Sequence, residues 1–200
     1  MSAEDYRASL RSATRGYWSG ALTLDQFDEH MRATMNRQLA IAWAEGAAEC
    51  GVESEEDYSP EDWLVLGNAI QAEIEQVPSL ALDIEASRKG EGLLTPLLDR
   101  METWVLRYQD IRNEAKLRTC KDQKLEWVYG DTVHCDTCLA LNGVVKRASY
   151  WQQSGVQPQS PPNPLIDCGG WNCKCEFMST DKPITRGTLP VKRAAFLRVG

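Results

Sequence analysis

Five cysteines between residues 135 and 175 constrain this chain more than any other feature of its sequence. They form two groups, with Cys135 and Cys138 ahead and Cys168, Cys173 and Cys175 behind. The stretch that joins them is rich in Pro and Gly and offers few apolar residues for a core. A short segment of this kind needs cross-links to fold. We therefore expect the cysteines to hold a small C-terminal lobe together.

The spacing of the cysteines favours a metal site. A Cys-x2-Cys turn such as 135–138 places two thiolates on one tetrahedral cation, and a distant second group completes the shell. We predict one structural Zn²⁺, with ligands drawn from Cys135, Cys138, Cys168, Cys173 and Cys175. Four ligands suffice, so one thiol is spare. Cys173 and Cys175 share a face if they lie on a strand, but Cys168 and Cys173 are also a workable pair, and the choice stays open.

The residues around the two cysteine groups bear on roles other than metal binding. His134 adjoins the first thiol, and we expect its side chain to point away from the site. Cys50 and Cys120 stand alone in the sequence. The N-terminus has no apolar stretch behind its charges, so no secretory signal is expected, and a reduced compartment disfavours disulfides. A disulfide remains the alternative to a metal if the protein acts outside the cell.

The first 125 residues or so have the periodicity of helices. Apolar residues recur at helical spacing from Leu24 to Leu39 behind a cap at Thr23. A second run follows Ser59 and Pro60, a capping residue with a proline in the first turn, and a long third run follows Thr95-Pro96. After residue 124 the segments LEWVYG and GVVKRASY read as short strands separated by turns.

These patterns predict a mainly α-helical protein. We expect a helical body of three to four long helices over residues 1–124 and a small Cys-rich lobe of strands and loops over 125–180. A basic extended tail is expected over 181–200, where Arg186, Lys192, Arg193 and Arg198 occur without an acid after Asp181. No window approaches the ~18 apolar residues of a membrane span, so no membrane association is expected.

The charge is divided unevenly along the chain. Residues 1–100 carry 8 Lys and Arg against 19 Asp and Glu, or -11, and residues 101–200 carry 14 against 10, or +4. The acidic half cannot hold a phosphate backbone, whereas the basic tail can do so weakly. A chain with two signs of charge is better suited to docking on other proteins.

The sequence offers little for catalysis. It contains two histidines, His30 and His134, and neither begins the His-x-Glu motif of a zinc deaminase. A Gly-rich phosphate loop and a Gly-x-Ser-x-Gly elbow are also missing. An enzyme of nuclease or transferase type, working through carboxylates such as Glu114 and Asp131, is therefore the weaker alternative, as is a cellular zinc-binding adaptor.

The C-terminal third resembles a known family. Lys124, the run LEWVYGDTVHCDTCLALNGVVKRASYW, the Pro-rich stretch and CGGWNCKC are similar, in this order, to the C-terminal region of phage minor head proteins, also called Mu protein F-like or phage head morphogenesis proteins. The resemblance covers about residues 110–178. The matching positions are Lys124, Trp127, Asp131, Cys135, Cys138, Leu141, Gly143, Val145, Cys168, Cys173 and Cys175. The chain departs from the family pattern at three positions. Asn113 lies in its Arg-x-Glu step, Lys174 replaces the usual Arg, and Trp171 is inserted in the closing cysteine motif; none of these changes removes a cysteine.

The resemblance implies a non-enzymatic structural role in the virion. Proteins of this family are present in few copies in the head, near the portal and the scaffold or capsid, and assist head assembly and genome packaging or ejection. It therefore implies portal and capsid or scaffold proteins as partners, assembly in the host cytoplasm, and a place in the head interior or close to the portal.

Overall fold

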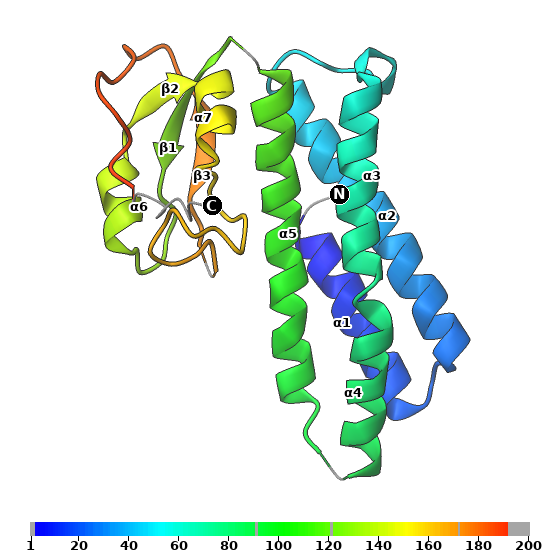
Figure 1. Cartoon of the computed structure of the whole chain (residues 1–200). Helices are drawn as coiled ribbons and strands as arrows, with labels where there is room; N and C mark the ends of the chain where they lie inside the picture. The colour runs from blue at the N-terminus through cyan, green and yellow to red at the C-terminus, as the bar shows by residue number, and fades with distance from the viewer. Residues whose placement is uncertain (1–2, 91, 121, 172, 192–200) are drawn as a thin grey trace, which may run out of the picture. The chain divides into compact units, whose positions relative to one another are not determined.

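The computed structural model describes residues 3–90, 92–120, 122–171 and 173–191 (Figure 1). It is mainly helical with a small three-stranded sheet in its Cys-rich C-terminal region, which confirms the expected fold class. The chain divides into two compact units. The helical unit comprises residues 1–45 and 54–111, and the cysteine unit comprises residues 46–53 and 112–200. The cysteine unit thus takes in the ends of two long helices in addition to the lobe expected at 125–180.

The helical elements come from five segments that follow one another along the chain. They are α1 (Ala3–Ser19), α2 (Leu24–Ala48), α3 (Pro60–Ile74), α4 (Val77–Lys89) and α5 (Thr95–Thr119), with a 3-10 turn η1 (Glu55–Asp57) before α3. Figure 1 shows α3 and α4 running one after the other along nearly the same line. The break between them lies just ahead of Pro78. Because the nitrogen of Pro78 has no hydrogen to donate to the preceding turn, α3 cannot run on unbroken through this position.

The helix starts predicted from the sequence are present. Thr23 Oγ1 accepts a bond from the Gln26 N–H at 3.3 Å, and Gln26 Oε1 accepts one from the Thr23 N–H at 3.0 Å. Ser59 and Asp62 make the same reciprocal pair at the start of α3, where Pro60 fills the first position. Each pair satisfies two backbone donors that a helix end would otherwise leave open.

The core of the helical unit is built from the apolar faces that the periodicity predicts. Tyr17 of α1 stacks on Phe27 of α2 with ring centroids 4.9 Å apart. Arg107 of α5 bonds Glu73 of α3 at 2.7 Å, and both side chains are largely buried. The largest fully buried side chains here are Tyr6, Leu10, Phe27, Met31, Met35, Leu39, Trp43 and Leu80. An apolar interior together with the Arg107–Glu73 ion pair therefore joins the helices of this unit.

The cysteine unit is organised by a three-stranded antiparallel sheet. β1 (Lys124–Val128) lies between β2 (Val145–Arg147) and β3 (Glu176–Ser179), and two short helices, α6 (Asp136–Leu141) and α7 (Ala148–Ser154), complete it. Trp127 of β1 pairs in register with Phe177 of β3. These two rings and Trp151 of α7 pack with centroids 5.1–5.9 Å apart. This aromatic trio is fully buried and forms the centre of the core of the unit.

Part of the expected tail is attached to the sheet. The Thr185 N–H donates to the Val145 carbonyl at 2.9 Å, and Lys146 Nζ donates to the carbonyls of Thr185 and Gly187. Leu189 and Val191 pack against the core. Residues 181–191 form no helix or strand and are mostly exposed, and these backbone and apolar contacts attach the stretch to the cysteine unit. Arg186 is exposed, and Lys192, Arg193 and Arg198 lie outside the described residues.

One close helix contact in the cysteine unit depends on a glycine. A Cβ atom at Gly46 would lie 2.2 Å from the Arg112 carbonyl oxygen and 2.9 Å from the Ala115 Cβ. Gly67, exposed in the middle of α3, meets nothing within 4 Å. The two positions are both helical glycines, and they differ in the space that surrounds them.

This contrast yields a matched prediction. Gly46→Ala should lower the free energy of unfolding by about 1–3 kcal/mol, because the backbone of α5 has to move away. Gly67→Ala should raise it by about 0.5–1 kcal/mol, because alanine restricts the unfolded chain and favours helix. Urea unfolding of the two variants measures both changes. A stabilising Gly46→Ala would contradict the close packing of the two helix ends.

Candidate metal centre

The first cysteine pair is positioned by α6. Cys135 caps this helix, and its sulfur accepts a bond from the Cys138 N–H at 3.4 Å. The Thr137 N–H in the same turn donates to Asp167 Oδ2 at 3.0 Å, and the Asp167 N–H donates to Thr137 Oγ1 at 3.2 Å. Asp167 immediately precedes Cys168, so these bonds bring the third cysteine to the start of α6.

The last cysteine pair is held by the entry into β3. The Cys175 N–H donates to the Cys173 sulfur, with the nitrogen and sulfur 3.5 Å apart. The buried side chain of Gln159 donates from Nε2 to the Cys175 carbonyl at 2.7 Å. This bond ties the Pro-rich loop to the cysteine segment and fixes its backbone.

All five predicted cysteines gather in one cluster. Cys135, Cys138 and Cys168 form one group of sulfurs within 4.8 Å of one another, and Cys138, Cys173 and Cys175 form a second. Cys138 belongs to both. The Cys138 and Cys168 sulfurs are 3.9 Å apart. The cluster can therefore hold a metal ion, and its soft thiol donors suit Zn²⁺ better than a hard cation.

The two groups differ in burial. Cys138, Cys173 and Cys175 are buried, whereas Cys135 and Cys168 are half-buried. A cavity of about 230 Å³ is lined by four of the five, Cys135, Cys138, Cys168 and Cys173. Burial raises the pKa of the Cys168 thiol to about 11. A thiol of this kind stays protonated at neutral pH unless a cation compensates the thiolate, so metal binding here releases protons.

His134 lies differently from the expectation. Its Nδ1 is 3.8 Å from the Cys175 sulfur, and its Nε2 is 2.8 Å from the Gly130 carbonyl oxygen. The prediction that this side chain points away from the site is therefore wrong. The sequence places His134 beside Cys135, but the loop that precedes α6 turns the imidazole toward the other end of the cluster.

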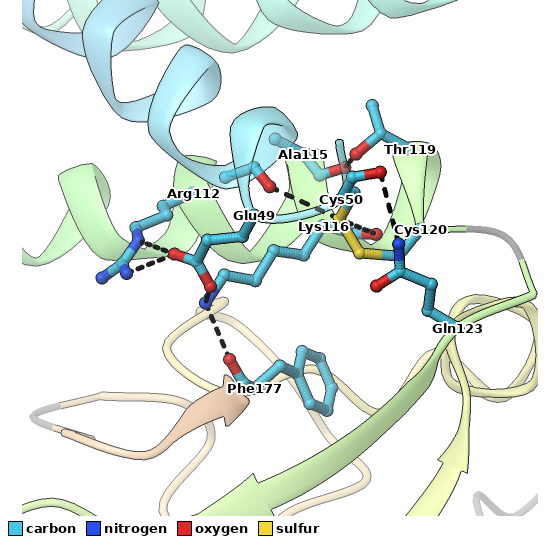
Figure 2. The surroundings of a disulfide bond; sticks show 10 residues. Glu49, Cys50, Arg112, Ala115, Lys116, Thr119, Cys120, Gln123 and Phe177 are labelled. Carbon is cyan, nitrogen blue, oxygen red and sulfur yellow. Dashed lines mark hydrogen bonds and ion pairs between the residues drawn. A yellow bond between two sulfur atoms is a disulfide. The ribbon is translucent and has the colours of Figure 1, made fainter. Parts of the chain in front are cut away.

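A disulfide joins the two cysteines that stand alone in the sequence. Cys50 follows α2, Cys120 follows α5, and their sulfurs are bonded (Figure 2). The Cα atoms are 4.9 Å apart, within the usual range for a disulfide. The expectation that disulfides are disfavoured is thus wrong for this pair, because the close approach of the two helix ends brings residues 70 positions apart together.

A buried lysine accompanies this disulfide. Lys116 Nζ lies 2.7 Å from Glu49 Oε2 and donates to the Phe177 carbonyl at 2.7 Å (Figure 2). Its side chain is 1 % exposed. Burial lowers the pKa of Lys116, and the bond to Glu49 opposes this shift. Glu49 also binds Arg112. The ammonium group thus connects β3 to the ends of both helices, a contact for which the sequence gives no signal.

The two carboxylates considered for catalysis do not converge on the cluster. Glu114 on α5 bonds Arg118 at 2.6 Å, and Asp131 is exposed on the loop after β1. Neither belongs to a group of potential metal ligands among the described residues. The cluster is therefore made of thiols, with one imidazole beside them.

Comparison with protein-family models, with curated proteins and with solved structures finds no match to this chain. Among the described residues, none of the helices combines the length and the apolar character that crossing a bilayer requires. The cysteine cluster is thus the feature on which a functional argument can be built.

The shared position of Cys138 yields a prediction. Cys138→Ser should abolish stoichiometric metal binding and disorder the cysteine unit, because both sulfur groups lose a member. The helical circular dichroism should largely survive, since α1 to α4 have their own core. Elemental analysis and circular dichroism of the full chain measure the two effects. A control, Cys50→Ser, should retain the metal. Equal metal content in both variants would contradict a metal at this cluster.

Proposed function

We propose that this chain is a non-enzymatic minor head protein of a tailed phage, assembled in the host cytoplasm and placed in the head interior or close to the portal. Its partners are portal and capsid or scaffold proteins, and it serves head morphogenesis together with genome packaging or ejection. The metal in its cysteine unit is a structural Zn²⁺.

One observation carries this proposal more than any other. The ordered motif that resembles the minor head proteins contains five cysteines in two groups, and these five converge in the fold. Converging thiols can cross-link a lobe that is poor in regular structure when they bind a common metal ion. The resemblance supplies the family, and the cluster supplies a physical reason for its cysteine pattern.

The two alternatives have less support. An enzyme of nuclease or transferase type requires converging acid and base groups, and Glu114 is engaged by Arg118 on its own helix. A cellular zinc-binding adaptor accounts for the cluster but not for the ordered motif around it. A portal or terminase gene beside the gene for this chain distinguishes a phage protein from the adaptor.

The proposal predicts where the protein is found. Mass spectrometry of purified heads should detect this chain in few copies relative to the major capsid protein, and it should copurify with the portal. Deleting its gene should reduce the yield of filled heads, and Cys138→Ser should reproduce that defect. Normal heads from the deletion strain would contradict a role in morphogenesis.

The basic tail is proposed to make a weak, sequence-independent contact with packaged DNA. Lys182 is paired with Glu126 at 2.7 Å, so it adds little. The remaining cations of this region are Arg186, Lys192, Arg193 and Arg198. Four phosphate contacts give a slope of about -3 to -4 in log K against log salt, and the acidic half of the chain opposes approach.

A variant in which the positive charges of the tail are removed tests this contact. Replacing Arg186, Lys192, Arg193 and Arg198 by Gln should abolish binding to duplex DNA at low salt while the fold is kept. Replacing the exposed Arg15 and Arg37 of the helical unit by Gln is the control and should leave binding unchanged. Titrations at several salt concentrations measure the slope. Tight, salt-resistant binding by the tail variant would favour the enzyme alternative.

A further inference from the structure

We propose that the metal ion is held by three thiolates and one imidazole, from Cys138, Cys173, Cys175 and His134, and that Cys135 and Cys168 remain thiols. This ligand set rests on the structural metal proposed above and answers which of the five sulfurs are used. It also adds a ligand that the cysteine pattern does not contain.

Burial separates the ligands from the spare thiols. Cys138, Cys173 and Cys175 are 1 %, 4 % and 0 % exposed and form one sulfur group. Cys135 and Cys168 are only half-buried. Structural zinc sites are closed, with four protein ligands and no water. The buried group therefore fits a structural ion, and it lacks one ligand.

The imidazole of His134 is oriented to supply that ligand. Its Nδ1 is 3.8 Å from the Cys175 sulfur, and a tetrahedral ion with Zn–S of about 2.3 Å and Zn–N of about 2.0–2.1 Å places these atoms about 3.6 Å apart. Nδ1 is not within 4.8 Å of all three sulfurs of the group. Binding of an ion by all four groups therefore requires the ring to move toward the Cys138 and Cys173 sulfurs.

The other ring nitrogen is already fixed. Nε2 lies 2.8 Å from the Gly130 carbonyl, which can only accept, so Nε2 carries the hydrogen and Nδ1 keeps its lone pair. Histidine ligands of metal ions characteristically donate their second N–H to a carbonyl or carboxylate in this way. The Tyr129 ring packs on the imidazole with centroids 4.5 Å apart and limits its rotation.

A glycine allows the loop that carries His134 to reach Cys175. A Cβ atom at Gly130 would lie 2.4 Å from the Lys174 carbonyl oxygen, so only glycine permits this approach. The contact sets the Gly130 carbonyl, and with it the imidazole, beside the segment of Cys173 and Cys175. The position of His134 is thus built into the backbone.

The position of Cys135 argues against a place in the same shell. His134 and Cys135 are adjacent, and the structure directs them to different sulfur groups. The bond from the Cys138 N–H to the Cys135 sulfur closes the first turn of α6, which a neutral thiol can do without a metal. Cys135 is thus explained as a helix cap.

Cobalt substitution of the full chain tests this ligand set. Co²⁺ is the probe because its charge-transfer absorption grows with the number of thiolates, and its visible bands report tetrahedral geometry. We expect one Co²⁺ per chain with three thiolates. Cys135→Ser and Cys168→Ser should leave both signals unchanged, whereas Cys173→Ser should lose about a third of the charge-transfer intensity. The first two variants are the matched controls for the third.

Histidine is tested separately. His134→Ala should keep the three-thiolate intensity, shift the visible bands and weaken Zn²⁺ binding at least tenfold in competition with a chelator. Gly130→Ala should weaken binding in the same direction with an unchanged thiolate count. Alkylation of the metal-bound chain, read by mass spectrometry, should label Cys135 and Cys168 ahead of the other three cysteines of the cluster.

The outcomes separate this proposal from the one on which it rests. If the chain binds one ion but His134→Ala matches the wild type in spectrum and affinity, the ligand set is overturned and the structural metal stands. Loss of intensity in Cys135→Ser, or two ions per chain, overturns it as well. If no metal binds to the reduced, folded protein, both proposals are overturned.

Discussion

The Cys138 thiol is the point on which the arrangement of the cysteine unit depends. It is the one sulfur common to both groups, and it lies in the first turn of α6, where Cys135 and Asp167 fix the backbone on either side. Segments that are 30 to 40 residues apart in the sequence meet at this sulfur. A metal ion bound there supplies the cohesion that a loop with few regular hydrogen bonds cannot supply itself.

The aromatic trio and the helix ends provide a second source of cohesion for the same unit. Trp127, Trp151 and Phe177 bury large apolar surfaces, and Lys116 connects Phe177 to Glu49 beside the disulfide. The ammonium group is costly to bury, and its bonds to a carboxylate and a carbonyl offset that cost. Because Leu117 and Cys120 of α5 join this core, the unit extends beyond the lobe that the cysteine pattern alone defines.

The sequence predicts the elements that form through contacts between residues close together in the chain. Thr23 and Ser59 start helices because their side chains bond nearby backbone groups, and the Cys-x2-Cys turn forms for an equally local reason. The convergence of the five thiols was predictable because a metal site has a spacing rule. The Cys50–Cys120 disulfide and the burial of Lys116 were not, since both depend on how the ends of α2 and α5 approach.

His134 shows the limit of spacing arguments most clearly. Neighbouring residues in an extended segment face opposite ways, which is in line with the expectation that a residue beside Cys135 faces away from the site. The rule holds, but the cluster contains two sulfur groups, and His134 and Cys135 each lie beside a different one. A residue that faces away from the Cys135 group faces the Cys175 group, because the close contact of Gly130 with Lys174 brings the two segments together. The orientation of the imidazole is therefore decided by a backbone contact between residues 44 positions apart, which a motif read along the chain does not contain.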